Sequence, residues 1–145
     1  MRQPLVVAGS VIALALLVGF VLYFTSANQS AAVTVACPVA QQVCEFSTPY
    51  GEARFELTPQ PPSSKAPIAF ELRLSAEQPQ RVWIDLQGKE MYMGVNQTNL
   101  KFESGSWNAP GTLGVCTTGT MRWVLALILE RGDEQQIYNF EFDAR

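Results

Sequence analysis

The chain has 145 residues, of which 48% are hydrophobic, and a formal net charge of -3 at pH 7. It contains no histidine, which excludes Ser-His and Cys-His catalysis and histidine-based zinc sites. The slight excess of acidic residues provides no positive field of the kind that attracts phosphate backbones. Nucleic acid is therefore not an expected partner.

The first feature along the chain is an apolar segment, residues 5–24, that carries no charge. As a helix rising about 1.5 Å per residue, it is long enough to cross the roughly 30 Å of bilayer hydrocarbon. Arg2 precedes this segment and the next charged residue is Glu45, so the positive-inside rule keeps the short N-terminal end in the cytoplasm. We predict a single-pass protein of the inner (cytoplasmic) membrane, with its C-terminal domain in the periplasm.

This topology divides the chain into three parts. Residues 1–25 are the predicted transmembrane anchor, 26–32 are a linker of small and polar residues, and 33–145 are a periplasmic domain. The domain is long enough to bury one hydrophobic core. The alternative is that the N-terminal segment is a cleaved signal peptide, which would release a secreted domain.

Three cysteines follow the linker, in a compartment where disulfides form. Cys37 and Cys44 lie close together in the sequence, at a spacing that a short hairpin brings within bonding reach. We therefore predict a Cys37–Cys44 disulfide and an unpaired Cys116. A Cys44–Cys116 bridge is the alternative, because bridges between sheets occur in β-sandwiches.

The rest of the chain alternates between apolar and polar residues, with proline and glycine signals between the alternating runs. Strands are predicted at 33–37 and 43–46, which form a hairpin, and at 54–58, 68–75, 82–86, 91–100, 123–129 and 137–142. Loops or turns are predicted at 59–64, 87–90, 105–114 and 131–134.

Short strands at this spacing predict an all-β domain, an antiparallel immunoglobulin-like sandwich preceded by one N-terminal transmembrane helix. Residues 123–129 are apolar on both faces, which is typical of a central strand. They are too few to cross a membrane as a helix. A closed barrel is the less favoured arrangement.

Sulfur-containing side chains form the pattern with the most specific chemistry. In a strand, Met91 and Met93 point to the same side, and Cys116 and Met121 bracket a loop farther along the chain. Thioether and thiolate ligands favour Cu(I) over harder cations. The four residues are the predicted metal site, with Cu(I) as its ion. The alternative is that the methionines fill gaps in the core and Cys116 is a small buried residue.

Other chemistry has weaker support in the sequence. No spacing pairs two of the carboxylates Asp85, Glu90, Glu103 and Glu130, so we predict a protein that is not an enzyme and has no catalytic residues. Aromatic residues can anchor a protein partner. The candidates for this role are Tyr50, Trp83, Tyr92 and Trp107.

A family resemblance rests on a series of segments in a fixed order. The anchor and the closely spaced cysteine pair are followed by Gly-Lys-Glu-Met-Tyr-Met-Gly at 88–94, Gly-Ser-Trp at 105–107, Cys116, and Met-Arg-Trp at 121–123. In this order the chain resembles membrane-anchored periplasmic proteins of Gram-negative bacteria, some of which accompany the machinery that assembles respiratory copper oxidases. It is more loosely similar to the YtkA/FixH-like group of small extracytoplasmic sandwiches.

The resemblance implies a function as well as a fold. It implies a membrane-anchored, non-catalytic protein that binds Cu(I) through Met91, Met93, Cys116 and Met121 and helps to assemble a respiratory oxidase. The expected partners are the membrane and an inner-membrane or periplasmic protein. The absence of histidine is a departure from many copper carriers. The alternative is a structural protein-protein interaction module without a metal.

Overall fold

The computed structural model describes residues 13–20, 31–114 and 119–145. The chain forms two compact units, Met1–Ser30 and Ala31–Arg145. In the first unit, residues 13–20 are helical. No helix within the described ranges is long and apolar enough to span a membrane. Most of the predicted anchor and linker lies outside these ranges.

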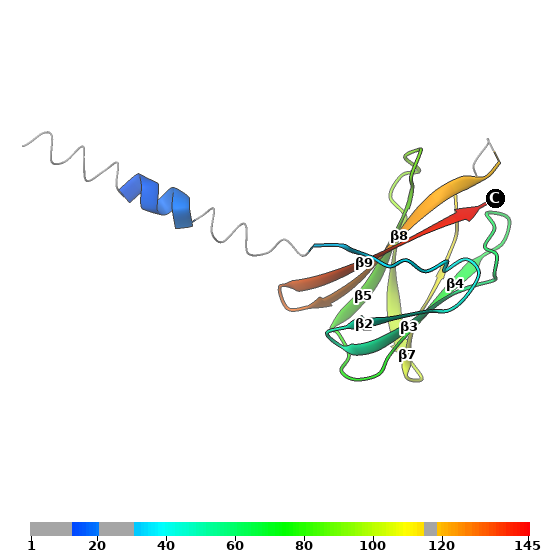
Figure 1. Cartoon of the computed structure of the whole chain (residues 1–145), viewed down its shortest axis with the longest axis horizontal. Helices are drawn as coiled ribbons and strands as arrows, with labels where there is room; N and C mark the ends of the chain where they lie inside the picture. Colours follow the sequence, from blue (N-terminus) through cyan, green and yellow to red (C-terminus); the bar gives the residue numbers. More distant parts are fainter. Residues whose placement is uncertain (1–12, 21–30, 115–118) are drawn as a thin grey trace, which may run out of the picture. The chain divides into compact units, whose positions relative to one another are not determined.

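The second unit is all-β, as the sequence predicts. Its described residues form nine strands joined in one curled sheet (Figure 1). The strands are β1 (Val33–Thr34), β2 (Cys44–Thr48), β3 (Gly51–Thr58), β4 (Ile68–Leu74), β5 (Arg81–Gly88), β6 (Gln97–Glu103), β7 (Ser106–Gly111), β8 (Met121–Arg131) and β9 (Glu134–Ala144).

The strand order in the sheet is β1-β9-β8-β5-β6-β7-β4-β3-β2. Strand β6 joins the two halves, because its residues 97–100 pair with β5 and its residues 101–103 pair with β7. Every pairing is antiparallel except that of β1 with β9, which is parallel. The sheet therefore has two ends, β1 and β2, that are not hydrogen-bonded to each other.

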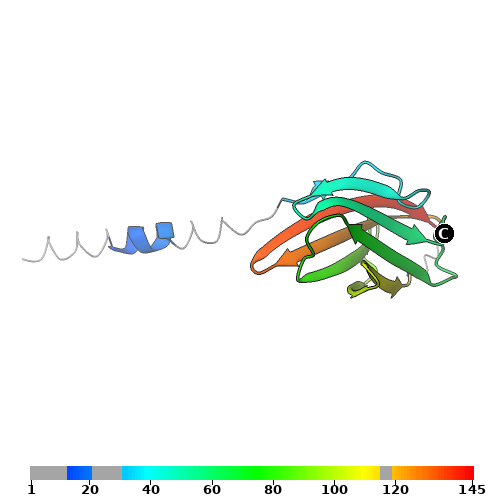
Figure 2. The same cartoon turned by 90° about the horizontal axis from the view of Figure 1, so that it is seen from below.

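The curl places β2 and β3 against β9 (Figure 2). Aromatic side chains from these strands are in contact with one another. The ring of Phe46 lies 4.8 Å from that of Tyr138 and 5.5 Å from that of Phe140, between centroids. Phe55 also lies 5.3 Å from Phe140, and both of these rings are fully buried. We call these four side chains the aromatic seam.

The core-facing residues follow the alternation of the sequence. On β3 and β4, every second side chain is buried, including Phe55 and Leu57 on β3 and Phe70 and Leu72 on β4. Strand β8 lies between β9 and β5, as expected for the apolar run 123–129. Its odd-numbered residues from Met121 to Leu129 face the main core, whereas Ile128 is buried outside that cluster.

The predicted hairpin between residues 33–37 and 43–46 is wrong. Val33 and Thr34 pair with β9, and β2 pairs with β3. Residues 38–42 form a local turn instead, in which the Pro38 carbonyl accepts hydrogen bonds from the N–H groups of Gln41 and Gln42. Two short segments gain more from pairing with the longer strands than from pairing with each other, since each added residue contributes ladder bonds and buried side chains.

Two further predictions are corrected around β6 and β7. The predicted strand 91–100 begins only at Gln97, and residues 91–96 have no regular structure. The predicted loop 105–114 contains β7, whose Trp107 and Ala109 are buried. Strand β7 accommodates Pro110 because beyond Asn108 it pairs only with β4, and proline is tolerated at such an edge.

Candidate functional site: the methionine end of the sheet

Three of the four predicted metal ligands lie where β5 ends and β8 begins. Strand β5 ends at Gly88, which pairs with Trp123 on β8. The Lys89 N–H then donates to the Arg122 carbonyl over 2.8 Å, which keeps the chain beside β8 as it leaves the sheet. We call this region the methionine end, defined by Met91, Met93 and Met121 with the two glycines, Gly88 and Gly114, that they contact.

Gly88 makes room for one pair of methionines. A Cβ atom at this position would lie 3.0 Å from Sδ of Met121 and would collide with the main-chain oxygen of Met91. The thioether of Met121 and the backbone of Met91 therefore both pack against the bare glycine. Met121 is only 4% exposed, whereas Met91 is 48% exposed.

Gly114 makes room for the third methionine. A Cβ atom there would lie 2.7 Å from Cε of Met93 and 3.6 Å from Cη2 of Trp123. Met93 is partly buried and packs against the edge of the core. Its thioether end thus lies beside the glycine, close to an indole ring that is itself almost fully buried.

Asn96 connects the two segments that carry these residues. The side-chain amide of Asn96 donates to the Thr112 carbonyl over 2.9 Å. The main-chain carbonyl of Asn96 accepts the N–H of Leu86, also over 2.9 Å. Segment 89–96 is therefore fixed both to β5 and to the segment that precedes β8. Hydrogen bonds of this kind position a segment that has no strand partner.

The predicted geometry of the site needs correction, although its sulfur atoms keep the chemistry of soft ligands. Met91 and Met93 are not on a strand, so strand alternation does not set their directions. The main-chain oxygen of Met91 lies against Gly88, as does Sδ of Met121, and Cε of Met93 lies against Gly114. Cys116 lies outside the described residues, between Gly114 and Met121 in the sequence. The four-residue ligand set stays a prediction.

Two ion pairs lie beside the methionine end, and the carboxylate of Glu90 accepts the main-chain N–H of Arg122 over 3.2 Å. Lys89 Nζ lies 2.7 Å from Oε1 of Glu141, and Arg122 Nε lies 3.1 Å from Oδ1 of Asp143. The hydrogen bond and the charge of Asp143 raise the pKa of the Arg122 guanidinium. Within the ranges that the structure describes, no three His, Cys, Asp or Glu side chains converge in a way that could hold a metal ion.

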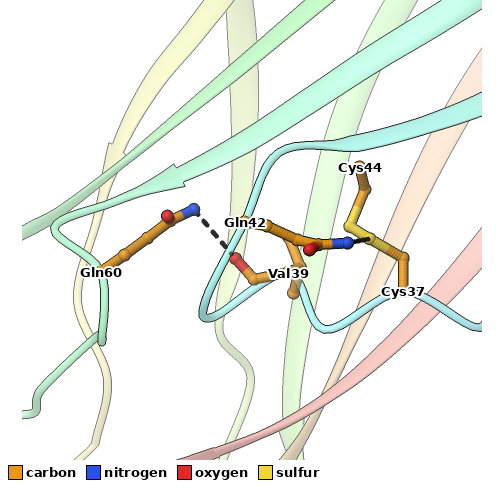
Figure 3. Close-up of a disulfide and its surroundings, with 5 residues drawn as sticks. All are labelled: Cys37, Val39, Gln42, Cys44 and Gln60. Atoms are coloured by element: carbon orange, nitrogen blue, oxygen red, sulfur yellow. Dashed lines mark hydrogen bonds between the residues drawn. A yellow bond between two sulfur atoms is a disulfide. The ribbon is translucent and has the colours of Figure 1, made fainter.

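The predicted Cys37–Cys44 disulfide is confirmed, with Cα atoms 5.9 Å apart. The alternative Cys44–Cys116 bridge is therefore wrong. The side-chain amide of Gln42 lies 3.7 Å from Sγ of Cys37, over the bridge (Figure 3). The bridge leaves Cys37 and Cys44 without a thiol that can ligate a metal. The prediction that Cys116 is unpaired falls outside the described residues.

Among the four aromatic residues that could anchor a partner, only Tyr92 is strongly exposed, at 78%. The indole N–H groups of Trp83 and Trp107 donate to Glu130 and Gln78 over 2.7 and 2.8 Å. Tyr50 is buried beneath the guanidinium of Arg131, 4.6 Å from its ring centroid. Sequence reasoning missed Val95, which is 79% exposed in the same segment as Tyr92.

Comparison with protein-family models, curated proteins and solved structures finds no match to this chain. The class of the protein therefore rests on its own fold and site. The described residues of the second unit form an all-β domain with a Cys37–Cys44 disulfide and with methionines packed against glycines where β5 ends and β8 begins.

Proposed function

We propose that this protein is a membrane-anchored periplasmic domain that captures Cu(I) with sulfur ligands and delivers it to a membrane partner without catalysis. One observation carries the proposal. The main chain of Met91 and the thioether of Met121 pack against Gly88, and the thioether end of Met93 packs against Gly114. Cys116 belongs to the segment between Gly114 and Met121.

The chemistry of these residues suits Cu(I) better than any harder ion. Thioether and thiolate sulfur prefer soft cations, and the chain offers no imidazole. The neighbouring carboxylates of Glu141 and Asp143 are already paired with cations. Solvent exposure rises from the buried Met121 to the half-exposed Met91. This difference suits an ion that is bound near the surface and then transferred to a partner.

The membrane topology and the immunoglobulin-like sandwich are parts of the same proposal. The disulfide supports an oxidising compartment. Leu14, Leu16 and Leu17 are exposed on the helix at 13–20, and such side chains suit a lipid environment. The two halves of the sheet, which face each other across the aromatic seam, support a two-layered sandwich. The resemblance to proteins that accompany oxidase assembly supports a respiratory copper oxidase as the destination.

The experiment is an anaerobic Cu(I) titration of the full chain in detergent micelles, against a chelator that competes for the ion. Ascorbate keeps the copper reduced and leaves the disulfide intact. We expect one equivalent to bind, with an affinity that falls at least tenfold in the Met91→Leu/Met93→Leu variant, because each lost ligand contributes on the order of 1 kcal/mol or more. Val95→Leu is the matched control from the same segment.

The two variants separate ligation from packing. Leucine has nearly the volume of methionine, so Met93→Leu preserves the contact with Gly114 and Trp123. Tryptophan emission, to which Trp83, Trp107 and Trp123 all contribute, reports whether the fold around the site is preserved. Absence of Cu(I) binding at micromolar buffered copper contradicts the proposal, as does binding that is equal in the double variant and the native chain.

A second candidate function is docking of a protein partner without a metal. It is favoured by the exposure of Tyr92 and Val95, since apolar side chains grouped on a surface mark interaction sites. A photo-crosslinking residue at position 95 is expected to capture a membrane protein in cells, and one at exposed Glu45 is expected not to. If the crosslink persists in the Met91→Leu/Met93→Leu variant, docking does not depend on copper.

A further inference from the structure

One edge of β9 is covered at two points and open between them. At the first point, the Asn139 carbonyl accepts the N–H of Val35 over 2.9 Å, next to the pairing with β1. At the second, the main-chain oxygen of Arg145 accepts the N–H of Ser64 over 2.8 Å and the hydroxyl of Ser63 over 3.1 Å. These contacts come from two different loops.

The backbone groups of Glu141 and Asp143 face this open stretch. The register between β8 and β9 is unbroken from Met121↔Ala144 to Arg131↔Glu134. In such a ladder the N–H and C=O groups of successive residues face opposite edges. Those of Glu141 and Asp143 therefore face the same way as those of Asn139. No backbone hydrogen bond from any residue in the described ranges reaches them.

A groove runs along the open stretch. Its first part has a volume of about 280 Å³, with Glu141, Phe142 and Asp143 on one side and Pro38 and Pro61 among the residues on the other. A second part of about 480 Å³ continues past Pro61 and Asp143 to Arg145. An extended residue advances about 3.3 Å along a strand, so the distance from Asn139 to Arg145 corresponds to about 20 Å of extended chain.

The far wall of the groove does not compete for the β9 backbone. Pro38 and Pro61 have no N–H group, and the N–H groups of Gln41 and Gln42 bond to the Pro38 carbonyl. The Val39 carbonyl accepts the side-chain amide of Gln60 over 3.3 Å (Figure 3). One side of the groove thus has free backbone groups, and the other side has few.

Residues 35–39, which follow β1, do not pair with this open stretch. Beyond Val35 the backbone makes local bonds, from Cys37 N–H to the Val35 carbonyl and from Val39 N–H to the Cys37 carbonyl. The disulfide also holds Cys37 to the start of β2. A second folded copy is disfavoured too, because the wall at Pro38 and Pro61 recesses the edge, and a recess admits one strand more readily than another sheet.

We propose that the edge of β9 between Asn139 and Arg145 binds an extended segment of a partner protein, which adds to the sheet as a further strand. The unpaired N–H and C=O groups recognise a polypeptide main chain. The carboxylates of Glu141 and Asp143 are paired with Lys89 and Arg122, but they stay 40% and 54% exposed and have acceptor positions left for basic side chains on the outer face. Buried Phe142 and Ala40 favour apolar side chains on the inner face. The partner segment therefore alternates apolar and basic residues.

The test uses a synthetic peptide of alternating valine and lysine and the full chain in detergent micelles, followed by amide hydrogen exchange. We expect the peptide to slow exchange at Glu141 and Asp143. A peptide of the same sequence that carries N-methyl groups on alternate amides, on the pairing edge, is expected to bind about tenfold more weakly or worse, because each lost hydrogen bond costs about fivefold to tenfold.

Two variants test the site itself. Glu141→Pro removes an N–H that faces the groove and is expected to reduce peptide binding, while Glu141→Ala retains that N–H and most of the binding. Circular dichroism shows whether each variant is folded, and the N-methylated peptide tests the same contact without any variant. Unchanged exchange at millimolar peptide overturns the proposal, as does equal binding of the methylated peptide. Protection of Glu141 and Asp143 that grows with protein concentration alone overturns it in favour of a second copy.

Discussion

The aromatic seam and the methionine end use large apolar side chains in opposite ways. At the seam, Phe55 and Phe140 are fully buried and touch across the two halves of the sheet. At the methionine end, flexible side chains pack against bare glycines, and Met91 remains half exposed. The first region couples distant strands, while the second leaves polarizable atoms near the surface.

We propose that this difference separates the stability of the domain from its Cu(I) binding. Rigid rings with few rotamers hold the two halves of the sheet together at low entropic cost. Unbranched thioethers adapt to irregular spaces and provide soft ligand atoms. We therefore expect changes at the seam to alter the free energy of unfolding and leave Cu(I) affinity unchanged, whereas changes at the methionine end lower Cu(I) affinity.

Phe140→Ala tests the seam most severely. The ring is fully buried and contacts both Phe46 and Phe55, so its loss leaves a cavity between the two halves of the sheet. We expect the free energy of unfolding to fall by about 3–5 kcal/mol, measured by urea denaturation. A loss below about 1 kcal/mol would show that the seam does not hold the halves together.

Removal of the disulfide by Cys37→Ala/Cys44→Ala is expected to have the next largest effect. The bridge closes a short loop, with a sequence separation of 7, for which chain entropy gives about 2.5 kcal/mol. Urea denaturation under non-reducing conditions measures it. Cu(I) affinity should be unchanged, and a large loss of affinity would contradict the separation of the two regions.

Two glycine variants sharpen the account of the methionine end. Gly88→Ala collides with the Met91 backbone as well as with Met121, so we expect about 1–3 kcal/mol of destabilisation. Gly114→Ala meets chiefly the tip of Met93, which can rotate away at smaller cost. Both variants should weaken Cu(I) binding. Equal destabilisation by the two would show that the site is not arranged as described.

A pH titration of stability gives the smallest expected effect. Burial raises the pKa of both Tyr50 and Tyr138 above the ordinary value of 10.0. As the pH rises through about 10, the unfolded chain loses these protons before the folded chain does, so stability is complete below that pH and falls above it. Tyr50→Phe should flatten this alkaline decline, as measured by urea midpoints. An unchanged slope would contradict the assignment.

The strands that the sequence predicts well are those with one wet face. From Phe70 to Leu74 on β4 and from Tyr138 to Ala144 on β9, apolar and polar residues alternate, as Phe70, Leu72 and Leu74 do around Glu71 and Arg73. Such a pattern fixes both the strand and the side that faces the core. The disulfide follows from the nearness of Cys37 and Cys44 in the sequence.

The sequence does not show which strands pair with each other or where the irregular segments lie. The residues around Val33 do not predict its pairing with Tyr138, because that contact depends on how the sheet curls. The glycine and proline residues around β7 predict a loop, but burial of Trp107 outweighs this local preference and the segment forms a strand. The methionine end could be predicted from residue types, but its geometry depends on Gly88 and Gly114, whose role only packing reveals.

The most direct test of the central claim is X-ray absorption spectroscopy of the full chain loaded with one equivalent of Cu(I). The account predicts a first coordination shell that contains only sulfur and that loses scatterers in the Met91→Leu/Met93→Leu variant. A shell dominated by nitrogen or oxygen would contradict it, as would a sulfur shell that is identical in the variant and the native chain.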